Sequence, residues 1–275
     1  MQMTIAQALD DARLARVDAR VLMCHALVVS TAYLIAHVDE KLTSVQYAAY
    51  DSLAKRRAQG EPVAYIVGSR EFFSREYSVT PAVLIPRPET ELLVEYALER
   101  MAADSTAHVL DLGTGSGCIA ISIARERPLA HVVAVDNSAD AVAMTRKNAH
   151  RHQVSNIEIK LSNWFSALED RRFDVIVSNP PYVADRDAHL NHGDLRFEPS
   201  SALRGGDDGL DSVRTIIAAA PGYLAARGVL AIEHGYDQVA AVHAHLQSSG
   251  FADIFTRKDL AGIERISGGK STGAA

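Results

Sequence analysis

Cysteine is scarce in this chain: among 275 residues only Cys24 and Cys118 occur, far apart in the sequence. A disulfide framework is therefore not expected, and a reducing compartment, the cytoplasm, is the natural location. The 11 histidines are scattered, and no cysteine–histidine spacing typical of zinc appears. We therefore expect no bound metal.

Long apolar runs and an excess of basic residues are also missing. The opening MQMTIAQALDDARLARVDAR has early acidic residues and no apolar core of a signal peptide, and no run approaches the length of a membrane span. The formal net charge of −6 argues against a partner held mainly through phosphate contacts. We expect a cytoplasmic monomer with no membrane partner and no direct nucleic-acid partner.

Residues 1–68 have a helical pattern and contain equal numbers of acidic and basic residues. Thr43 or Ser44 is placed to cap a helix that stops at Gly60, just before Pro62. Apolar residues recur at three- and four-residue steps, which is the spacing of a helix: Ile5, Leu9, Val17, Val21, Cys24 and Val28. The pattern predicts a small N-terminal helical domain.

The pattern changes twice in the rest of the chain. Residues 69–87 contain two short β-type pieces, EFF and EYSV, which predict a hairpin linking two domains. From residue 88, strands such as HVLDL, HVVAVD, IEIKL and FDVIVSN alternate with helices, one of them at about 209–226. This alternation predicts an α/β domain over residues 88–275, with a parallel sheet covered on both faces. The small polar tail, about 268–275, is predicted to be disordered.

The stretch VLDLGTGSGCIAISIA lies where the first of these strands passes into a helix. A dinucleotide fingerprint needs a glycine at position 118, where this chain has Cys118. The pattern is instead typical of a loop that holds the amino-acid end of S-adenosylmethionine, with glycines that let the backbone approach the ligand. The predicted loop consists of Gly113, Thr114, Gly115, Ser116 and Gly117.

Polar and aromatic residues end the next two strands. Asp136 is placed to accept hydrogen bonds from ribose hydroxyls, although a strand-end acid alone is often only a helix cap. Asn163 and Trp164 are placed to meet the edge and the face of an adenine, although a lone tryptophan more often packs in a core. Together with the glycine loop, these residues predict a nucleoside site.

The stretch VIVSNPPYVAD ends another strand at the same edge of the sheet. Asn179 offers a carbonyl oxygen, and Pro180, which cannot continue a ladder, frees a second. Tyr182, after Pro181, offers a flat face. Two acceptors beside an aromatic ring fit a planar NH2 group, in an amide or an exocyclic amine. The motif predicts that the two acceptors bind both N–H groups of this NH2 and hold its nitrogen in line with a methyl donor.

A family resemblance covers the chain from roughly residue 15 to 268. NPPY with DLGTGSG upstream is similar to amino-methyltransferases in general. Four further stretches reduce the number of families that the chain resembles: IPRPETE, LSNWFSAL, HGDLRFEPSSAL and EHGYDQ. With them, the chain resembles the bacterial release factor glutamine methyltransferases, the HemK/PrmC family.

The resemblance implies a Rossmann-like class I S-adenosylmethionine-dependent methyltransferase with a small N-terminal helical domain. It implies methyl transfer to the glutamine side-chain nitrogen in the Gly-Gly-Gln motif of peptide chain release factors, leaving S-adenosyl-L-homocysteine. The loop 113–117, Asp136 and Trp164 would hold the cofactor; Asn179 to Tyr182 would hold the glutamine; the helical domain would recognise the release factor. Asn163 stands where the family commonly has aspartate, and we expect weaker cofactor binding. Roles for Arg87, Glu89 and Glu198 stay open.

Two alternatives remain at this level. An adenine-amino methyltransferase acting on nucleic acid uses the same acceptors for a flipped base, but the acidic balance and the lack of a basic region argue against it. A non-catalytic module that only binds the cofactor is the second alternative. The intact NPPY motif argues against that reading.

Overall fold

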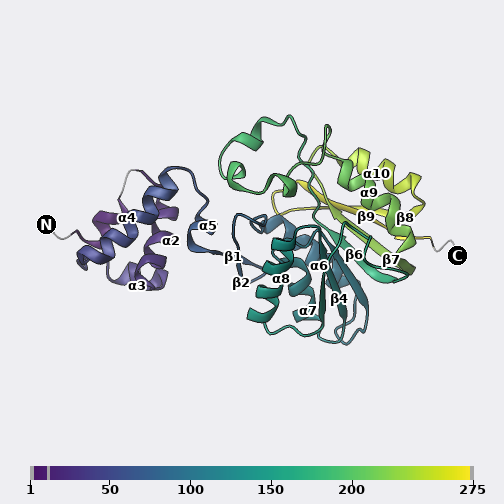
Figure 1. The fold of residues 1–275 in the computed structure, drawn as a ribbon, viewed down its shortest axis with the longest axis horizontal. Coiled ribbons are helices and arrows are strands. Elements are labelled where there is room, and N and C mark those ends of the chain that lie inside the picture. The colour runs from purple at the N-terminus through teal and green to yellow at the C-terminus, as the bar shows by residue number, and fades with distance from the viewer. Residues whose placement is uncertain (1–2, 11–12, 273–275) are drawn as a thin grey trace. The chain divides into compact units, whose positions relative to one another are not determined.

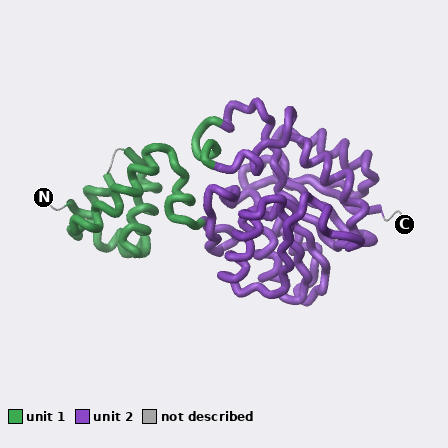
Figure 2. The backbone as a smooth tube through the Cα atoms, viewed as in Figure 1, with its two compact units in different colours: residues 1–69, 191–197 green, residues 70–190, 198–275 purple. Residues whose placement is uncertain are grey.

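The structure is a computed structural model that describes residues 3–10 and 13–272. The chain forms two compact units, one of residues 1–69 with 191–197 and one of residues 70–190 with 198–275 (Figure 2). The sequence pattern does not predict that residues 191–197 join the first unit. The boundaries expected near residues 68 and 87 stay predictions.

The first unit is helical and has its own core. Thr43 caps α4 in a capping box with Gln46, because each side chain bonds the other's backbone N–H. Among the described residues of this unit, the α-helices are α1 (Ile5–Leu9), α2 (Arg16–Leu27), α3 (Thr31–Ala36), α4 (Ser44–Ala58) and α5 (Val63–Val67).

The predicted helix is present as α2, but the valines that show the helical spacing do not form its buried face. Val17 is 67% exposed and Val28 is 90% exposed, and Val21 is exposed as well. The helix instead buries Ala19, Leu22 and Met23, which lie three and four residues apart on another side. Two apolar stripes are present in this helix, and the one with Ala19, Leu22 and Met23 packs into the core of the helical unit.

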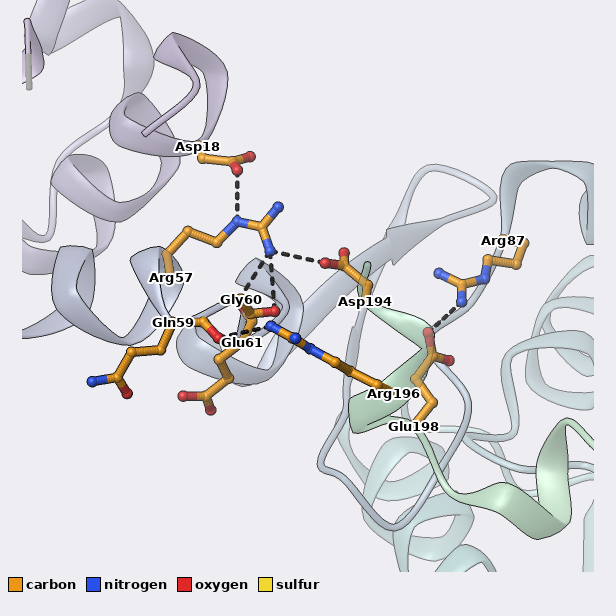
Figure 3. A network of polar contacts seen from close by, with 9 residues as sticks. All are labelled: Asp18, Arg57, Gln59, Gly60, Glu61, Arg87, Asp194, Arg196 and Glu198. Carbon is orange, nitrogen blue, oxygen red and sulfur yellow. Dashed lines mark hydrogen bonds and ion pairs between the residues drawn. The ribbon is translucent and has the colours of Figure 1, made fainter. Parts of the chain in front are cut away.

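Residues 191–197 are held in the helical unit by arginine side chains (Figure 3). Arg57 of α4 donates to the carboxylate of Asp18 at 2.7 Å and to that of Asp194 at 2.8 Å. Arg196 donates to the backbone carbonyl of Gln59 at 2.8 Å. These contacts join α2, the end of α4 and a stretch more than 130 residues further along the chain.

The second unit is built on a seven-stranded sheet of order β5-β4-β3-β6-β7-β9-β8 (Figure 1). A separate two-stranded hairpin, β1 (Ser69–Phe72) with β2 (Arg75–Ser78), stands where a hairpin was predicted. The large sheet consists of β3 (His108–Leu112), β4 (His131–Asp136), β5 (Ile157–Leu161), β6 (Phe173–Ser178), β7 (Leu224–Glu233), β8 (Phe251–Lys258) and β9 (Glu264–Ser271).

Helices cover both faces of this sheet, as the α/β pattern predicts (Figure 1). Val109, Val175 and Val177 pack on one face with α6 and α7, whereas Leu110 and Ile176 pack on the other face with α9 and α10. Because successive strand residues point to opposite faces, a central strand must be apolar on both. The helices of this unit are α6 (Glu91–Glu99), α7 (Cys118–Glu126), α8 (Ala139–Arg151), α9 (Asp211–Ala219) and α10 (Val239–Ser248).

Three expectations about the C-terminal part are wrong. The sheet is not wholly parallel, because β9 runs antiparallel to both β7 and β8. The helix expected to about residue 226 ends at Ala219, and a 3-10 turn containing Pro221 leads into β7. Residues 268–271, expected to be disordered, end strand β9; residues 273–275 lie outside the described residues.

Glycine explains the last of these differences. Gly268 pairs with Ala231 of β7, and a Cβ added to Gly268 would lie 2.0 Å from the backbone oxygen of Leu230. A sequence that looks like a flexible tail is therefore a strand that needs close backbone approach. Within the described residues, 3–10 and 13–272, no helix is both long enough and apolar enough to cross a membrane.

Candidate active site

A cavity of about 250 Å³ lies at the carboxyl ends of β3, β4, β5 and β6. The chain builds β4 and β5 on one side of β3 and β6 on the other, so the cavity lies where the strand order reverses. Nine of the predicted site residues line it: Gly113, Thr114, Gly115, Ser116, Asp136, Asn163, Trp164, Asn179 and Pro181. Gly117, Pro180 and Tyr182 do not line it.

The glycine loop joins β3 to α7 and forms one wall. Gly113 and Gly115 have φ of 71° and 57°, in the left-handed region that favours glycine. Asp111 lies fully buried beneath the loop and accepts from the Thr114 hydroxyl at 2.7 Å and from the backbone N–H of Ala120 at 3.2 Å. Its other oxygen, Oδ1, has no hydrogen-bond partner in the described part of the chain.

The electrostatics beneath the loop follow from burial. Desolvation raises the pKa of Asp111 to about 7, against the hydrogen bonds from Thr114 and Ala120, which lower it. A buried carboxylate oxygen without a donor is costly, and Asp111 itself does not line the cavity.

Asp136 ends β4 and is the predicted ribose acceptor. One carboxylate oxygen accepts from the backbone N–H of Gly115 and the other from that of Ser138, each at 2.9 Å. Burial raises the pKa of this carboxyl, and the backbone donors oppose the shift. Asp136 therefore ties the glycine loop to the start of α8, and its remaining lone pairs face the cavity that it lines.

Asn163 and Trp164 follow β5 and lie at the cavity. Asn163 is exposed, so its side-chain amide is accessible to a ligand. Trp164 is partly buried against the core and has φ of 49°, which is rare for a bulky residue. A Cβ added to Gly113 would lie 3.4 Å from the Trp164 ring. The Trp164 ring thus packs against the hydrophobic core and also lines the cavity.

The NPPY motif continues directly from β6. Asn179 lines the cavity, and its Nδ2 donates to the hydroxyl of Thr90 at 3.0 Å, which leaves Oδ1 as the acceptor for a ligand. Pro180 is buried. The Tyr182 hydroxyl donates to Oε1 of Glu233 at 3.1 Å, and this hydrogen bond fixes the position of the ring.

Arg87 also lines the cavity, and it pairs with the fully buried carboxylate of Glu198 (Figure 3). Glu198 also accepts from the backbone N–H of Ile85 at 3.2 Å. The IPRPETE and RFEP stretches of the sequence therefore meet at the cavity. The ion pair between Arg87 and Glu198 joins the two stretches, and Arg87 lines the cavity.

Comparisons with known proteins agree with this architecture. Residues 2–68 match the model of the PrmC N-terminal domain, and residues 89–200 match that of the Methyltransferase small domain. A release factor glutamine methyltransferase of Burkholderia pseudomallei is 50% identical, over 98% of this chain and 97% of the relative. One from Pseudomonas aeruginosa is 48% identical over 95% of each.

The chain belongs to the release factor glutamine methyltransferase family. The predicted class of enzyme, an S-adenosylmethionine-dependent protein-glutamine methyltransferase, is confirmed by this membership. A crystal structure of a methyltransferase from Pyrococcus furiosus is 16% identical and has a TM-score of 0.56, over 81% of this chain and 99% of that one. At this identity the match supports the Rossmann-like fold alone.

Residues that the sequence analysis did not single out also belong to this family member's site. Thr90 lines the cavity and bonds Asn179, and Glu233 bonds Tyr182. Asp111 supports the glycine loop. An acid at the end of a strand is the signal that could have identified Glu233, because Asp136 was found in that way. Thr90 carries no such signal, since its role depends on a contact 89 residues away.

Proposed function

We propose that this enzyme transfers a methyl group from S-adenosylmethionine to the side-chain nitrogen, N5, of the glutamine in the Gly-Gly-Gln motif of peptide chain release factors. The observation that carries the proposal is the position of Asn179. Its amide nitrogen is held by Thr90, and its oxygen is left as an acceptor at the cavity. An acceptor placed there suits the N–H of a planar amide.

The residues at the cavity fit the cofactor. The glycine loop allows close approach of the backbone, and Asp136 lines the cavity at the end of the next strand. Asn163 and Trp164 would hold the adenine by its edge and face. Bound S-adenosylmethionine supplies an electrophilic methyl group and leaves as the neutral thioether, S-adenosyl-L-homocysteine.

The protein's own contribution is positioning and electrostatics. An amide nitrogen is a weak nucleophile because its lone pair is shared with the carbonyl group. Oδ1 of Asn179 accepts one N–H group of the glutamine, orients the nitrogen and stabilises the positive charge that grows on it. The sequence motif assigns the second N–H group to the carbonyl of Pro180 and the flat face to Tyr182, although neither residue lines the cavity. The nitrogen then loses one proton to water.

The helical unit is proposed to recognise the release factor. It has a core separate from that of the catalytic unit, and it bears the exposed valines of α2. A protein substrate needs contacts beyond the single side chain that enters the cavity, and an additional folded module can supply them.

The test is a turnover assay with an intact release factor and a labelled methyl donor, followed by mapping of the label to the glutamine. Asn179→Ala should bind the cofactor within a few-fold of wild type while methyl transfer falls about a hundredfold or more, because its oxygen matters most once charge develops. Asn179→Asp, which keeps an acceptor, should retain more activity than Ala. Transfer by Asn179→Ala near the wild-type rate would contradict the role of Asn179. Label on nucleic acid instead of the release factor would contradict the substrate.

A further inference from the structure

Asn148, within α8, is completely buried, and its side-chain amide makes three hydrogen bonds to backbone groups. Its Nδ2 donates to the carbonyl of Ser116 at 2.8 Å and to that of Ser78 at 3.0 Å. Its Oδ1 accepts from the N–H of Ser78 at 2.8 Å. An asparagine amide has two N–H groups, and both are used here. The opposite orientation would set the oxygen against two carbonyls, so these contacts fix the way the amide points.

Helix formation alone does not favour an asparagine at position 148. Asparagine is a weak helix former, and a buried amide is costly unless it is bonded. The buried neighbours Val142, Met144 and Ala149 on the same helix are apolar. An apolar side chain at position 148 would suit the helix better but would remove the three hydrogen bonds. The asparagine is therefore explained by the backbone groups that it holds.

Two side chains of α8 hold the second half of the glycine loop. The Thr145 hydroxyl donates to the carbonyl of Gly115 at 3.0 Å, and Asn148, three residues further along the same helix face, donates to that of Ser116. Because a peptide group is planar and trans, a held carbonyl also fixes the N–H of the next residue. Gly115 and Ser116 both line the cavity. Thr145 and Asn148 therefore set the backbone of the wall at which the cofactor is proposed to bind.

The other partner of Asn148 belongs to the hairpin of β1 and β2. Ser78 is the last residue of β2, and β1 begins at the boundary between the two units. The hairpin is also held by α7, since the hydroxyls of Tyr77 and Ser122 form a hydrogen bond of 2.8 Å. That contact does not involve the glycine loop. Asn148, in contrast, bonds the hairpin and the glycine loop with one amide group.

We propose that Asn148 is a positioning residue that fixes the cofactor loop and couples it to the hairpin. One planar amide joins the two segments, so a shift of either segment breaks a hydrogen bond of that amide. Coupling of this kind is reciprocal: if losing the contact weakens cofactor binding by some factor, the bound cofactor stabilises the contact by the same factor. The inference rests on the proposed cofactor site and does not depend on the methyl acceptor.

Asn148→Leu is the first test, because leucine has a similar shape, favours a helix and neither donates nor accepts. The dissociation constant for S-adenosylmethionine, measured by calorimetry, should rise about fivefold to a hundredfold, the usual range of coupling between sites. Asn156→Leu is the matched control. The Nδ2 of Asn156 hydrogen-bonds three backbone carbonyls away from the cavity, those of Ala124, Arg127 and Ala130. This variant should lower the denaturant midpoint but keep the dissociation constant within about twofold of wild type.

Hydrogen exchange tests the coupling in the wild-type protein. Saturating S-adenosylmethionine should slow exchange of the Ser78 N–H, which donates to Asn148, by about fivefold or more. The N–H of Phe73 is the control in the same hairpin, because it donates to the carboxylate of Glu91 at 2.8 Å. General stabilisation by the cofactor would slow both amides alike. Equal slowing of the two amides, or slowing of neither, would overturn the coupling.

Two variants of Thr145 test the loop contact even if Asn148→Leu does not fold. Thr145→Val keeps the shape and removes the donor to the Gly115 carbonyl, so the dissociation constant for S-adenosylmethionine should rise at least about threefold. Thr145→Ser keeps the hydroxyl and should restore most of the affinity. Wild-type affinity in Thr145→Val would show that the held carbonyls do not matter for the cofactor, and would overturn the positioning role.

Failure of this inference and failure of the proposed function can be told apart. Cofactor binding by the wild type with unchanged affinity in Asn148→Leu would overturn the positioning role alone. A wild-type protein that does not bind S-adenosylmethionine would overturn the proposed function, and the positioning role with it. Normal cofactor binding without labelling of the release factor would overturn only the proposed substrate.

Discussion

Three carboxyl groups near the carboxyl edge of the sheet, those of Asp111, Asp136 and Glu233, have raised pKa values for one reason. Each is withdrawn from water, and desolvation outweighs the donors that surround it. They nevertheless serve different neighbours: the glycine loop, its link to α8, and the NPPY motif. Because their pKa values are raised, the burial of these carboxyl groups lowers stability near neutral pH.

The first prediction concerns pH and Asp111. Between the unfolded pKa near 4 and the folded value of about 7, the folded chain keeps a proton that the unfolded chain has lost. The contribution of Asp111 to the free energy of unfolding is therefore present at low pH and is lost as pH rises through about 7. Urea denaturation of the apoprotein at pH 5 to 8 should show this for wild type and not for Asp111→Asn.

The difference between the two proteins is the quantity to measure. His152 and His234 have lowered pKa values from burial and push stability in the opposite direction, but they act equally in both proteins. The difference should change by up to about 1.4 kcal/mol per pH unit inside the window and level off above it. Parallel curves would mean that Asp111 does not hold the proton.

The second prediction concerns Asp136. Asp136→Ala removes a proposed acceptor for the ribose and the acceptor for two backbone N–H groups. Hydrogen bonds to a charged group contribute about 1.5–3 kcal/mol, so the dissociation constant for S-adenosylmethionine should rise about tenfold to a hundredfold. Calorimetry measures it directly. Asp140→Ala, an exposed acid in the first turn of α8, is the control, and equal affinities in all three proteins would refute the assignment.

At the scale of elements, β9 shows how tightly the antiparallel end of the sheet is built. Gly268 lies against β7, and a methyl group there would overlap the backbone oxygen of Leu230. Strand backbones cannot move apart without losing the ladder between β7 and β9. Any side chain at position 268 therefore requires a shift of the backbone.

The third prediction follows from that contact. Gly268→Ala should lower the free energy of unfolding by about 1–3 kcal/mol or more, because overpacking forces backbone shifts. Gly222→Ala, on the exposed turn before β7, meets nothing within 4 Å and should cost much less. Denaturant midpoints of the two variants test the difference. Equal midpoints would show that the sheet adjusts easily.

Elements also show what could be predicted from sequence. The α/β alternation, the hairpin and the cap at Thr43 follow from local rules of period, turn and capping, and all three appear in the structure. The glycine loop, Asp136 and Asn179 could be found because strand ends mark one edge of a parallel sheet. The direction of β9 could not, because no local pattern distinguishes a parallel from an antiparallel last strand.

The sequence did not predict which residues of α2 are buried or which distant residues contact each other. In α2 two stripes satisfy helical spacing, and only tertiary packing selects Ala19, Leu22 and Met23 over Val17 and its neighbours. Thr90 and Glu233 act through contacts with residues far along the chain. Such pairings depend on the finished topology, and a single sequence contains no direct signal for them.

At the scale of the whole molecule, the fourth prediction addresses the helical unit. Deleting residues 1–68 should leave S-adenosylmethionine binding within a few-fold of wild type, since the residues that line the cavity remain. Methylation of an intact release factor should fall at least about tenfold in kcat/KM, while a short Gly-Gly-Gln peptide should be modified equally by both proteins. Full activity of the truncated protein on the release factor would remove the recognition role.

The full-length variant Arg57→Ala provides the control for that deletion. It keeps the helical unit but removes the links from Arg57 to Asp18 and Asp194. Amide hydrogen exchange in residues 191–197 should accelerate, and Arg56→Ala, which loses only its pair with Glu61, should leave that exchange unchanged. If Arg57→Ala changes kcat/KM only slightly, the larger loss of kcat/KM after deletion of residues 1–68 comes from the missing recognition surface.

The chain visits the helical unit twice, first with its beginning and again with residues 191–197. A gene rearrangement that replaced only the first stretch would leave Asp194 and Arg196 facing a module that lacks Arg57 and the Gln59 carbonyl. The two stretches are far apart in the coding sequence, but their side chains depend on each other. Replacing the helical unit in this protein therefore requires replacing both residues 1–69 and residues 191–197, because exchanging the first stretch alone loses the contacts of Asp194 and Arg196.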